Sequence, residues 1–328
     1  MMEWIKKIVW PLALVMGGFC MAKAENPEEK KGDVIITVFS DFYSGFGRVN
    51  GERGFDLDRA YIGYEYRASS ELEIKAVMDF GQSRQVDDYH RIGFIKNAQV
   101  TWQRNGWELN GGLISTTQFK TQEDFWGKRY VMKSFQDEYK FGSSADLGIS
   151  AAYTVNDWWL LDVIVANGEG YKNLQTGKGL QYGAGMTFRP VESMVLRLYG
   201  SYNEASEKAL KGVTNLAFFA GYQNRWLSVG GEYNHQLNTD FIDGQDASGV
   251  SLYATFRTGD KVSLFGRWDR LYSRNAWNKA QDGMNALVGA EFRLGKYVKL
   301  APNVRVTLPE EESLGKECYF YLNAAFVL

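Results

Sequence analysis

The chain has 328 residues, of which 45% are hydrophobic and 15% aromatic, with 35 glycines and only 5 prolines. This length fits one large domain or two ordinary ones. After the first two dozen residues there is no apolar run of about 18 residues, which excludes a membrane protein of the helical kind.

Residues 1–24 are typical of a secretory signal peptide. Lys6 and Lys7 precede an apolar stretch, and the sequence AKA at 22–24 has the small-x-small pattern of a cleavage site. We expect residues 25–32 to form a short periplasmic tail of the mature chain. Without residues 1–24 the net charge is −4, and this mild acidity argues against nucleic acid as a partner.

From residue 33 onward, apolar and polar residues alternate with the period of two that strands have. In the third such segment, Leu72, Ile74 and Met78 share one face, whereas Glu73 and Lys75 lie on the other. Most of the segments have the length of a tilted membrane-spanning strand, which is about 9–11 residues. Sixteen strands are expected, near residues 33–44, 55–67, 71–82, 92–104, 106–116, 145–155, 157–167, 180–189, 194–203, 214–224, 226–237, 249–257, 261–272, 284–294, 297–308 and 316–328.

The connections between these segments are short and long in turn. Several short ones, such as Asn105-Gly106, have the residue types that tolerate positive φ in hairpin turns. Short turns on one side and long loops on the other are typical of outer-membrane barrels. Aromatic residues of the apolar face lie beside the short turns, where we expect a girdle at the membrane interface. They are Tyr66, Trp102, Trp107, Tyr153, Trp159, Phe188, Phe256, Phe292 and Phe326.

The polar face of the segments distinguishes a membrane barrel from a soluble β-sandwich. A sandwich needs a second apolar face, yet here the opposite face carries charges. A closed barrel of about 16–18 strands lines an aqueous channel with that face, and closure pairs every backbone group in lipid. We therefore expect an all-β fold, a closed antiparallel transmembrane barrel over residues 33–328, integral to the outer membrane of a Gram-negative-type bacterium. Pro302 removes a ladder donor inside the fifteenth segment and predicts a bulge or a shifted strand boundary there.

The C-terminal stretch CYFYLNAAFVL at 318–328 fits a closing strand. It resembles the signal by which barrel-insertion machinery recognises its clients, although the last aromatic residue is Phe326 and the chain ends in Leu328. Cys318 is the one cysteine left after the signal peptide, so no intramolecular disulfide is expected. We expect its side chain to face lipid.

The sequence gives no catalytic, metal or cofactor site. Its two histidines, His90 and His235, are not accompanied by a serine elbow or a paired-acid motif. No metal-ligand spacing and no phosphate-binding glycine motif stands out either. We therefore predict a protein that is not an enzyme and carries no metal or cofactor.

The inward face carries acids and bases in nearly equal number. These charges either set a transverse field across the pore or are simply solvated and paired across strands. The candidate pore-lining residues are Arg59, Lys75, Asp79, Glu108, Arg189, Arg197, Arg267, Asp269, Glu291, Arg293 and Arg305.

The third long loop, residues 117–144, interrupts the regular alternation. We expect it to fold into the lumen with Trp126 and Tyr130 packed on the inner wall, because a loop in solvent does not need so many rings. An outward lid or a contact between subunits is the alternative. The residues that then meet the water column and form the constriction are Lys128, Arg129, Lys133, Asp137 and Glu138.

Three stretches resemble the porins related to the phosphate-selective porin O and P family, in the branch with shortened barrels. They are FDLDRAYIGYEYRASSELEIKAVMDFG at 55–81, TTQFKTQEDFWGKRYVMKSFQDEYKFGSSADLGISAAY at 116–153 and ANGEGYK at 166–172. The resemblance implies a sixteen-stranded, trimeric, passive channel. It does not establish phosphate as cargo, because the family's ladder of lumen arginines has no residue-by-residue match in this chain.

We therefore expect an outer-membrane porin that lets ions and small hydrophilic solutes diffuse through a channel narrowed by the third loop. One alternative is a channel selective for anions, phosphate or oligosaccharides, with Lys128, Arg129 and Lys133 as the binding residues. Another is a hydrolase or adhesin built on the long loops.

Overall fold

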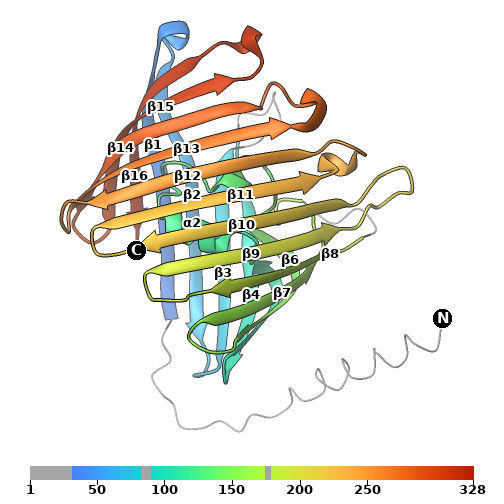
Figure 1. Ribbon diagram of the computed structural model, residues 1–328. Coiled ribbons are helices and arrows are strands. Elements are labelled where there is room, and N and C mark those ends of the chain that lie inside the picture. The colour runs from blue at the N-terminus through green and yellow to red at the C-terminus, as the bar shows by residue number, and fades with distance from the viewer. Residues whose placement is uncertain (1–31, 83–89, 174–178) are drawn as a thin grey trace. The chain divides into compact units, whose positions relative to one another are not determined.

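Sixteen strands form a closed antiparallel barrel in a computed structural model of the chain. Each strand pairs with its neighbours in sequence, and the first strand closes the ring by pairing with the last. The structure describes residues 32–82, 90–173 and 179–328, so the expected signal peptide and nearly all of the expected periplasmic tail lie outside it. Figure 1 shows the tilted strands side by side around the wall.

The strands agree with the expected segments to within a few residues. The first, second and twelfth strands extend furthest beyond expectation, each by two residues at its outer end. The strands are β1 (Gly32–Phe46), β2 (Arg53–Arg67), β3 (Leu72–Gln82), β4 (Arg91–Arg104), β5 (Trp107–Ser115), β6 (Ala145–Thr154), β7 (Trp159–Ala166), β8 (Gln181–Phe188), β9 (Met194–Asn203), β10 (Val213–Gln223), β11 (Leu227–Leu237), β12 (Ala247–Arg257), β13 (Val262–Ser273), β14 (Gly283–Leu294), β15 (Val298–Pro309) and β16 (Glu317–Val327).

The alternation of side chains decides which face meets which solvent. Leu198, Phe218 and Leu252 are about half exposed and point outward, although they are apolar. Asn234 and Asn323 are fully buried and point inward, although they are polar. An apolar outside and a polar inside are the reverse of a soluble protein and match a barrel embedded in lipid.

The nine expected girdle residues lie on the outward face, at or beside the short-turn ends of the strands. Two pairs touch across neighbouring strands. The Trp107 and Tyr153 rings have centroids 4.6 Å apart, and the Trp159 and Phe188 rings stack at 4.2 Å. Such contacts fix aromatic rings side by side on a sheet and stabilise the pairing of the strands.

Two β-bulges interrupt the regular ladders, and neither lies at Pro302. One shifts the β1–β2 register beside Asp58, and the other shifts the β3–β4 register beside Lys96. At Pro302 the expected bulge is wrong: the β14–β15 pairs on either side keep one register, and only the two intervening pairs are missing. Pro302 stays paired with Leu322 of β16, so the missing donor is confined to one side of the strand.

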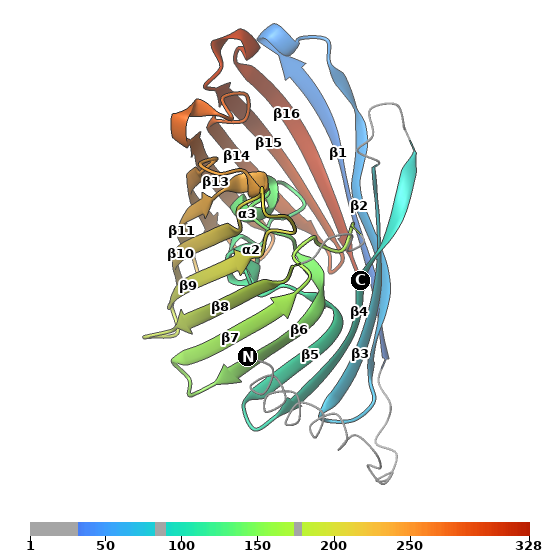
Figure 2. The ribbon, with the colours of Figure 1, turned by 90° about the vertical axis from the view of Figure 1, so that its right-hand side faces the viewer.

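The third long connection, residues 116–144, contains two α-helices, α2 (Lys120–Trp126) and α3 (Phe135–Glu138). Figure 2 shows both within the ring of strands. Short 3₁₀ turns occur in four outer connections, η1 (Gly47–Val49), η2 (Thr239–Phe241), η3 (Arg274–Ala276) and η4 (Glu312–Leu314). None of the helices in the described ranges is long and apolar enough to cross a bilayer.

Candidate functional site

The segment 116–144 rests on the inner wall through its aromatic rings. Trp126 is 2% exposed, and its ring centroid lies 5.4 Å from that of Tyr253 and 6.2 Å from that of Phe265. Its indole nitrogen donates to the Met132 carbonyl at 2.8 Å, so the buried ring leaves no unpaired donor. Burying an aromatic ring of this kind contributes about 1.5–3 kcal/mol. The rings therefore hold the segment to β12 and β13.

Inward-facing glycines make room for two of these rings. A Cβ atom on Gly249 of β12 would lie 2.0 Å from the Phe135 ring, and one on Gly221 of β10 would lie 2.6 Å from the Phe125 ring. Phe125 in turn packs against Phe219, with ring centroids 5.3 Å apart. The wall is thus shaped to receive the segment.

Two buried arginines of the wall fasten the segment by its backbone. Arg197 of β9 donates to the Thr117 carbonyl at 2.7 Å and pairs with Asp162 at 2.7 Å. Arg267 of β13 donates to the Lys133 carbonyl at 2.5 Å and pairs with Asp269 at 2.7 Å. Sequence reasoning placed these side chains in the lumen but missed that they bind the loop.

Arg129 joins the two helices of the segment. Its guanidinium donates to Glu123 of α2 and, at 2.5 Å, to Asp137 of α3. Burial alone would raise the pKa of Asp137, but Arg129 and Lys133 outweigh that effect and hold the pKa below its usual 3.8. The main role of Arg129 and Asp137 is therefore to cross-link the two helices, and their contact with solutes is secondary.

Lys128 differs from expectation, because it faces the wall and not the water column. It is 6% exposed, and its ammonium donates to Thr255 at 2.9 Å. Burial lowers its pKa from the usual 10.5 to about 8, although the Glu291 carboxylate acts in the opposite direction. Tyr130 donates to Glu291 at 2.8 Å and is also buried. The reason is local: the chain turns at Gly127, whose φ of 62° ends α2 and directs Lys128 to the wall.

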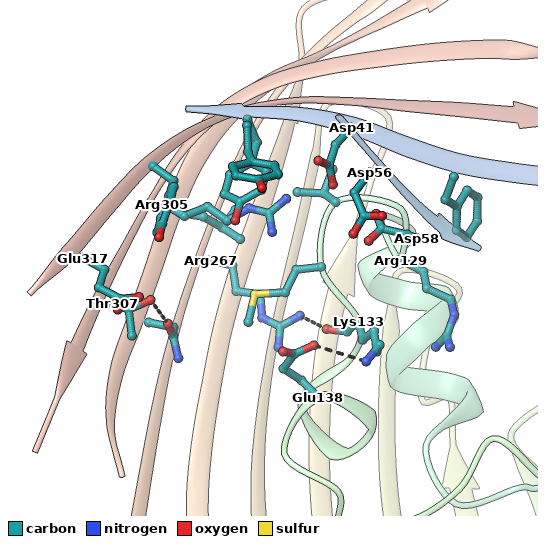
Figure 3. A pocket seen from close by; sticks show the side chains of 18 of the residues that line it. Asp41, Asp56, Asp58, Arg129, Lys133, Glu138, Arg267, Arg305, Thr307 and Glu317 are labelled. Atoms are coloured by element: carbon teal, nitrogen blue, oxygen red, sulfur yellow. Dashed lines mark hydrogen bonds and ion pairs between the residues drawn. The ribbon is translucent and has the colours of Figure 1, made fainter. Parts of the chain in front are cut away.

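A cavity of about 770 Å³ lies between the segment and the part of the wall that runs from β13 through β16 to β1 and β2. Figure 3 shows charged side chains converging on it from β1, β2, β13, β15, β16 and the loop. Six of the predicted site residues line it, three from the loop and three from strands. They are Arg129, Lys133, Glu138, Arg59, Arg267 and Arg305.

The other predicted residues lie elsewhere. Trp126, Lys128 and Tyr130 are buried where the loop packs on the wall, and Asp137 is bound by Arg129; none of these four lines the cavity. Arg189 lies one residue past the end of β8 and is exposed. The remaining strand residues face inward outside the cavity lining, and they are Lys75, Asp79, Glu108, Arg197, Asp269, Glu291 and Arg293.

Most of these inward charges have a partner. Arg59 binds Asp79 at 3.2 Å, and Tyr171 from the β7–β8 loop also donates to Asp79. Lys75 lies 3.3 Å from Glu65 on the neighbouring strand. The nearly equal numbers of acids and bases in the sequence thus correspond largely to ion pairs, some across strands and some within one strand or within the loop.

The two bulges bring residues to the lumen that sequence reasoning missed. Strict alternation places Asp56, Asp58 and Lys96 on the outward face, but Asp56 and Asp58 line the cavity and the Lys96 ammonium lies 4.4 Å from the centroid of the inward Tyr61 ring. A bulge inserts one residue and so changes the face of the residues beyond it. The sequence did offer a signal for these residues, because they are charged at positions where strict alternation expects apolar side chains.

The two histidines lie away from the cavity. His90 is exposed next to β4, and His235 pairs with Leu216 on the outward face with its Nδ1 atom 2.6 Å from Ser248 Oγ. Within residues 32–82, 90–173 and 179–328, no group of three or more His, Cys, Asp or Glu is arranged to hold a metal ion.

No protein-family model and no curated protein matches the sequence, so the narrower resemblance to the phosphate-selective family stays a prediction. Solved structures do match. OmpF of Salmonella typhi is 9% identical with a TM-score of 0.68, over 91% of this chain and 98% of that chain.

Two further porins are equally similar in structure. OprB of Pseudomonas putida is 10% identical with a TM-score of 0.69, over 90% of this chain and 94% of that chain. An anion-selective porin from Comamonas acidovorans is 10% identical with a TM-score of 0.67, over 92% and 100%. At such identities the likeness shows the fold alone. The chain therefore has the fold of the outer-membrane porins, a closed sixteen-stranded barrel integral to a membrane.

Proposed function

We propose that the protein is an outer-membrane porin of a Gram-negative-type bacterium, through which ions and small hydrophilic solutes diffuse passively. The observation that carries this is the third loop: it is fastened to the inner wall by rings and by two arginines, and it borders a charged cavity inside the barrel. A loop held there narrows the path without closing it, which makes it the constriction of the channel.

The charges of the loop argue against a dedicated anion site. Lys128 is turned to the wall and Arg129 is bound by two carboxylates, so only Lys133 of the three bases remains at the cavity with little compensation. Three bases that do not converge cannot bind one anion together. General diffusion therefore fits the geometry better than selective phosphate uptake.

Planar-bilayer recording of the purified protein tests the channel. We expect stable conducting steps that follow the salt concentration, because the lumen is polar and filled by water. A protein that inserts as a folded barrel but carries no current would rule the channel out.

A cysteine at the constriction tests the role of the loop. Lys133→Cys in a Cys318→Ala background places a single thiol of the mature chain on the cavity. A bulky methanethiosulfonate reagent should then lower the conductance of each open channel by roughly half, since the reagent fills part of the narrowest section. The matched control is Lys208→Cys in the same background, which lies exposed on the β9–β10 loop. Equal effects of the reagent on both variants would contradict the constriction.

A further inference from the structure

We infer that the cavity beside the third loop prefers cations, from inorganic ions to small alkylammonium solutes. The inference rests on the proposed porin function and adds the class of solute. Its basis is the charge that remains at the cavity once the ion pairs of the structure are accounted for.

Among the described residues, acids and bases line the cavity in equal numbers, but the bases are more fully neutralised. Six carboxylates and six basic side chains of the described ranges line the space. Arg59, Arg129 and Arg267 are each bound by a carboxylate that does not line it. The six carboxylates therefore face the three other basic residues of this lining, which are Lys133, Lys172 and Arg305. The near-equality of acids and bases in the sequence thus becomes an excess of negative charge at the cavity beside the third loop.

Asp41 of β1 is the central residue of this group of carboxylates. It is 8% exposed, its Oδ1 atom has no hydrogen-bond partner among the described residues, and its Oδ2 atom accepts a bond of 3.4 Å from Asn323. Asp58 and Asp56 are its acidic neighbours, and Figure 3 shows the three carboxyl groups grouped on the same side of the cavity. A buried carboxylate with an unused oxygen favours a cation beside it.

The bases near this group reduce the excess without removing it. Arg305 shares the space with Asp41 and Asp58, and Arg91 lies 3.8 Å from Asp56 with about half its side chain in water. The Arg91 contact offsets one negative charge, and the other carboxylates of the lining still outnumber its bases.

Aromatic rings extend the site for organic cations. Tyr43, Tyr319 and Tyr321 line the same cavity with their ring centroids 5.9–6.3 Å apart. The Arg305 guanidinium lies 3.8 Å from the Tyr321 centroid, so one ring already binds a cation by its face. Tyr43 and Tyr319 offer the same interaction to an alkylammonium group.

Reversal potentials in a KCl gradient test the preference. The wild-type channel should pass K⁺ more readily than Cl⁻, and Asp41→Asn with Asp58→Asn should lower the K⁺/Cl⁻ permeability ratio at least about twofold because two negative charges leave the constriction. Addition of tetraethylammonium to one side should reduce the wild-type K⁺ current more than that of the double variant.

The control pair is Glu65→Gln with Glu73→Gln, which removes two inward carboxylates that do not line the cavity. It should shift the ratio less than the aspartate pair. If the double aspartate variant does not fold, Asp58→Asn alone serves, since Asp58 is exposed to the lumen. Anion preference in the wild type, or equal shifts in both pairs, would overturn the inference while leaving the porin function intact. A folded barrel without current would instead overturn the porin function itself.

Discussion

Lys128 shows how the role of one residue depends on the direction of its side chain. A lysine in a loop rich in charge is expected in water, yet here it lies between Trp126, Phe265 and Thr255 with its ammonium buried. Removing a charge from water is costly unless partners replace the hydration. The lowered pKa of Lys128, about 8, is the direct sign of that cost.

A pH-dependent stability follows for Lys128. Its folded pKa of about 8 lies below the usual 10.5, so between these values the unfolded chain binds more protons and stability rises with pH. The rise amounts to at most on the order of 3 kcal/mol. Other lysines and tyrosines titrate in the same pH range, so their contribution has to be subtracted. The temperature at which the barrel unfolds on a gel is therefore measured as a function of pH for the wild type and for Lys128→Met, and the two profiles are compared. We expect the variant to lack the Lys128 part of the increase. Parallel pH profiles of the two proteins would refute the burial of a charged Lys128.

At the scale of the elements, the third loop is a folded structure within the barrel. Its two short helices have few contacts of their own and depend on the wall and on Arg129, which links Glu123 to Asp137. Helices of this length are not stable alone in water. The loop therefore keeps its shape because wall, rings and ion pairs act together.

Arg129→Met tests that link. The change leaves two neighbouring carboxylates without their shared cation, so the loop should loosen and the open channel should flicker more. The triple variant Arg129→Met, Glu123→Gln, Asp137→Asn removes the repulsion as well and should restore a quieter current, which single-channel noise analysis measures. If the single variant is as quiet as the wild type, Arg129 does not stabilise the loop.

At the scale of the whole molecule, closure of the ring is what makes the barrel possible in lipid. β1 and β16 pair over ten residue pairs from Thr37–Val327 to Phe46–Cys318. Without that pairing, two strand edges would expose backbone donors and acceptors to hydrocarbon, where each costs several kcal/mol.

Removal of residues 317–328 should therefore abolish the barrel as a unit. The expected result is loss of the compact, SDS-resistant form that migrates differently before and after boiling. Replacement of residues 206–209 in the β9–β10 loop by two glycines is the control and should keep that form, because it leaves every strand intact. A truncated chain that still shows heat-modifiable mobility would contradict the closing role of β16.

The sequence by itself determined the strands, their order and the solvent of each face. Alternation with period two is a local signal, and in a barrel each strand pairs with its neighbour in the chain, so local information suffices for the topology. The turn at Asn105-Gly106 and the length of the loop at 117–144 could be predicted as well, because both are also local features of the sequence.

Only the tertiary structure decided which charges act at the cavity. The bulges beside Asp58 and Lys96 change the face of a strand through one inserted residue, which alternation cannot anticipate. Whether a base is free or bound depends on partners distant in sequence, as Arg267 and Lys133 show. Charge at a pore depends on distances in space, and these arise only when the ring closes and the loop packs inside it.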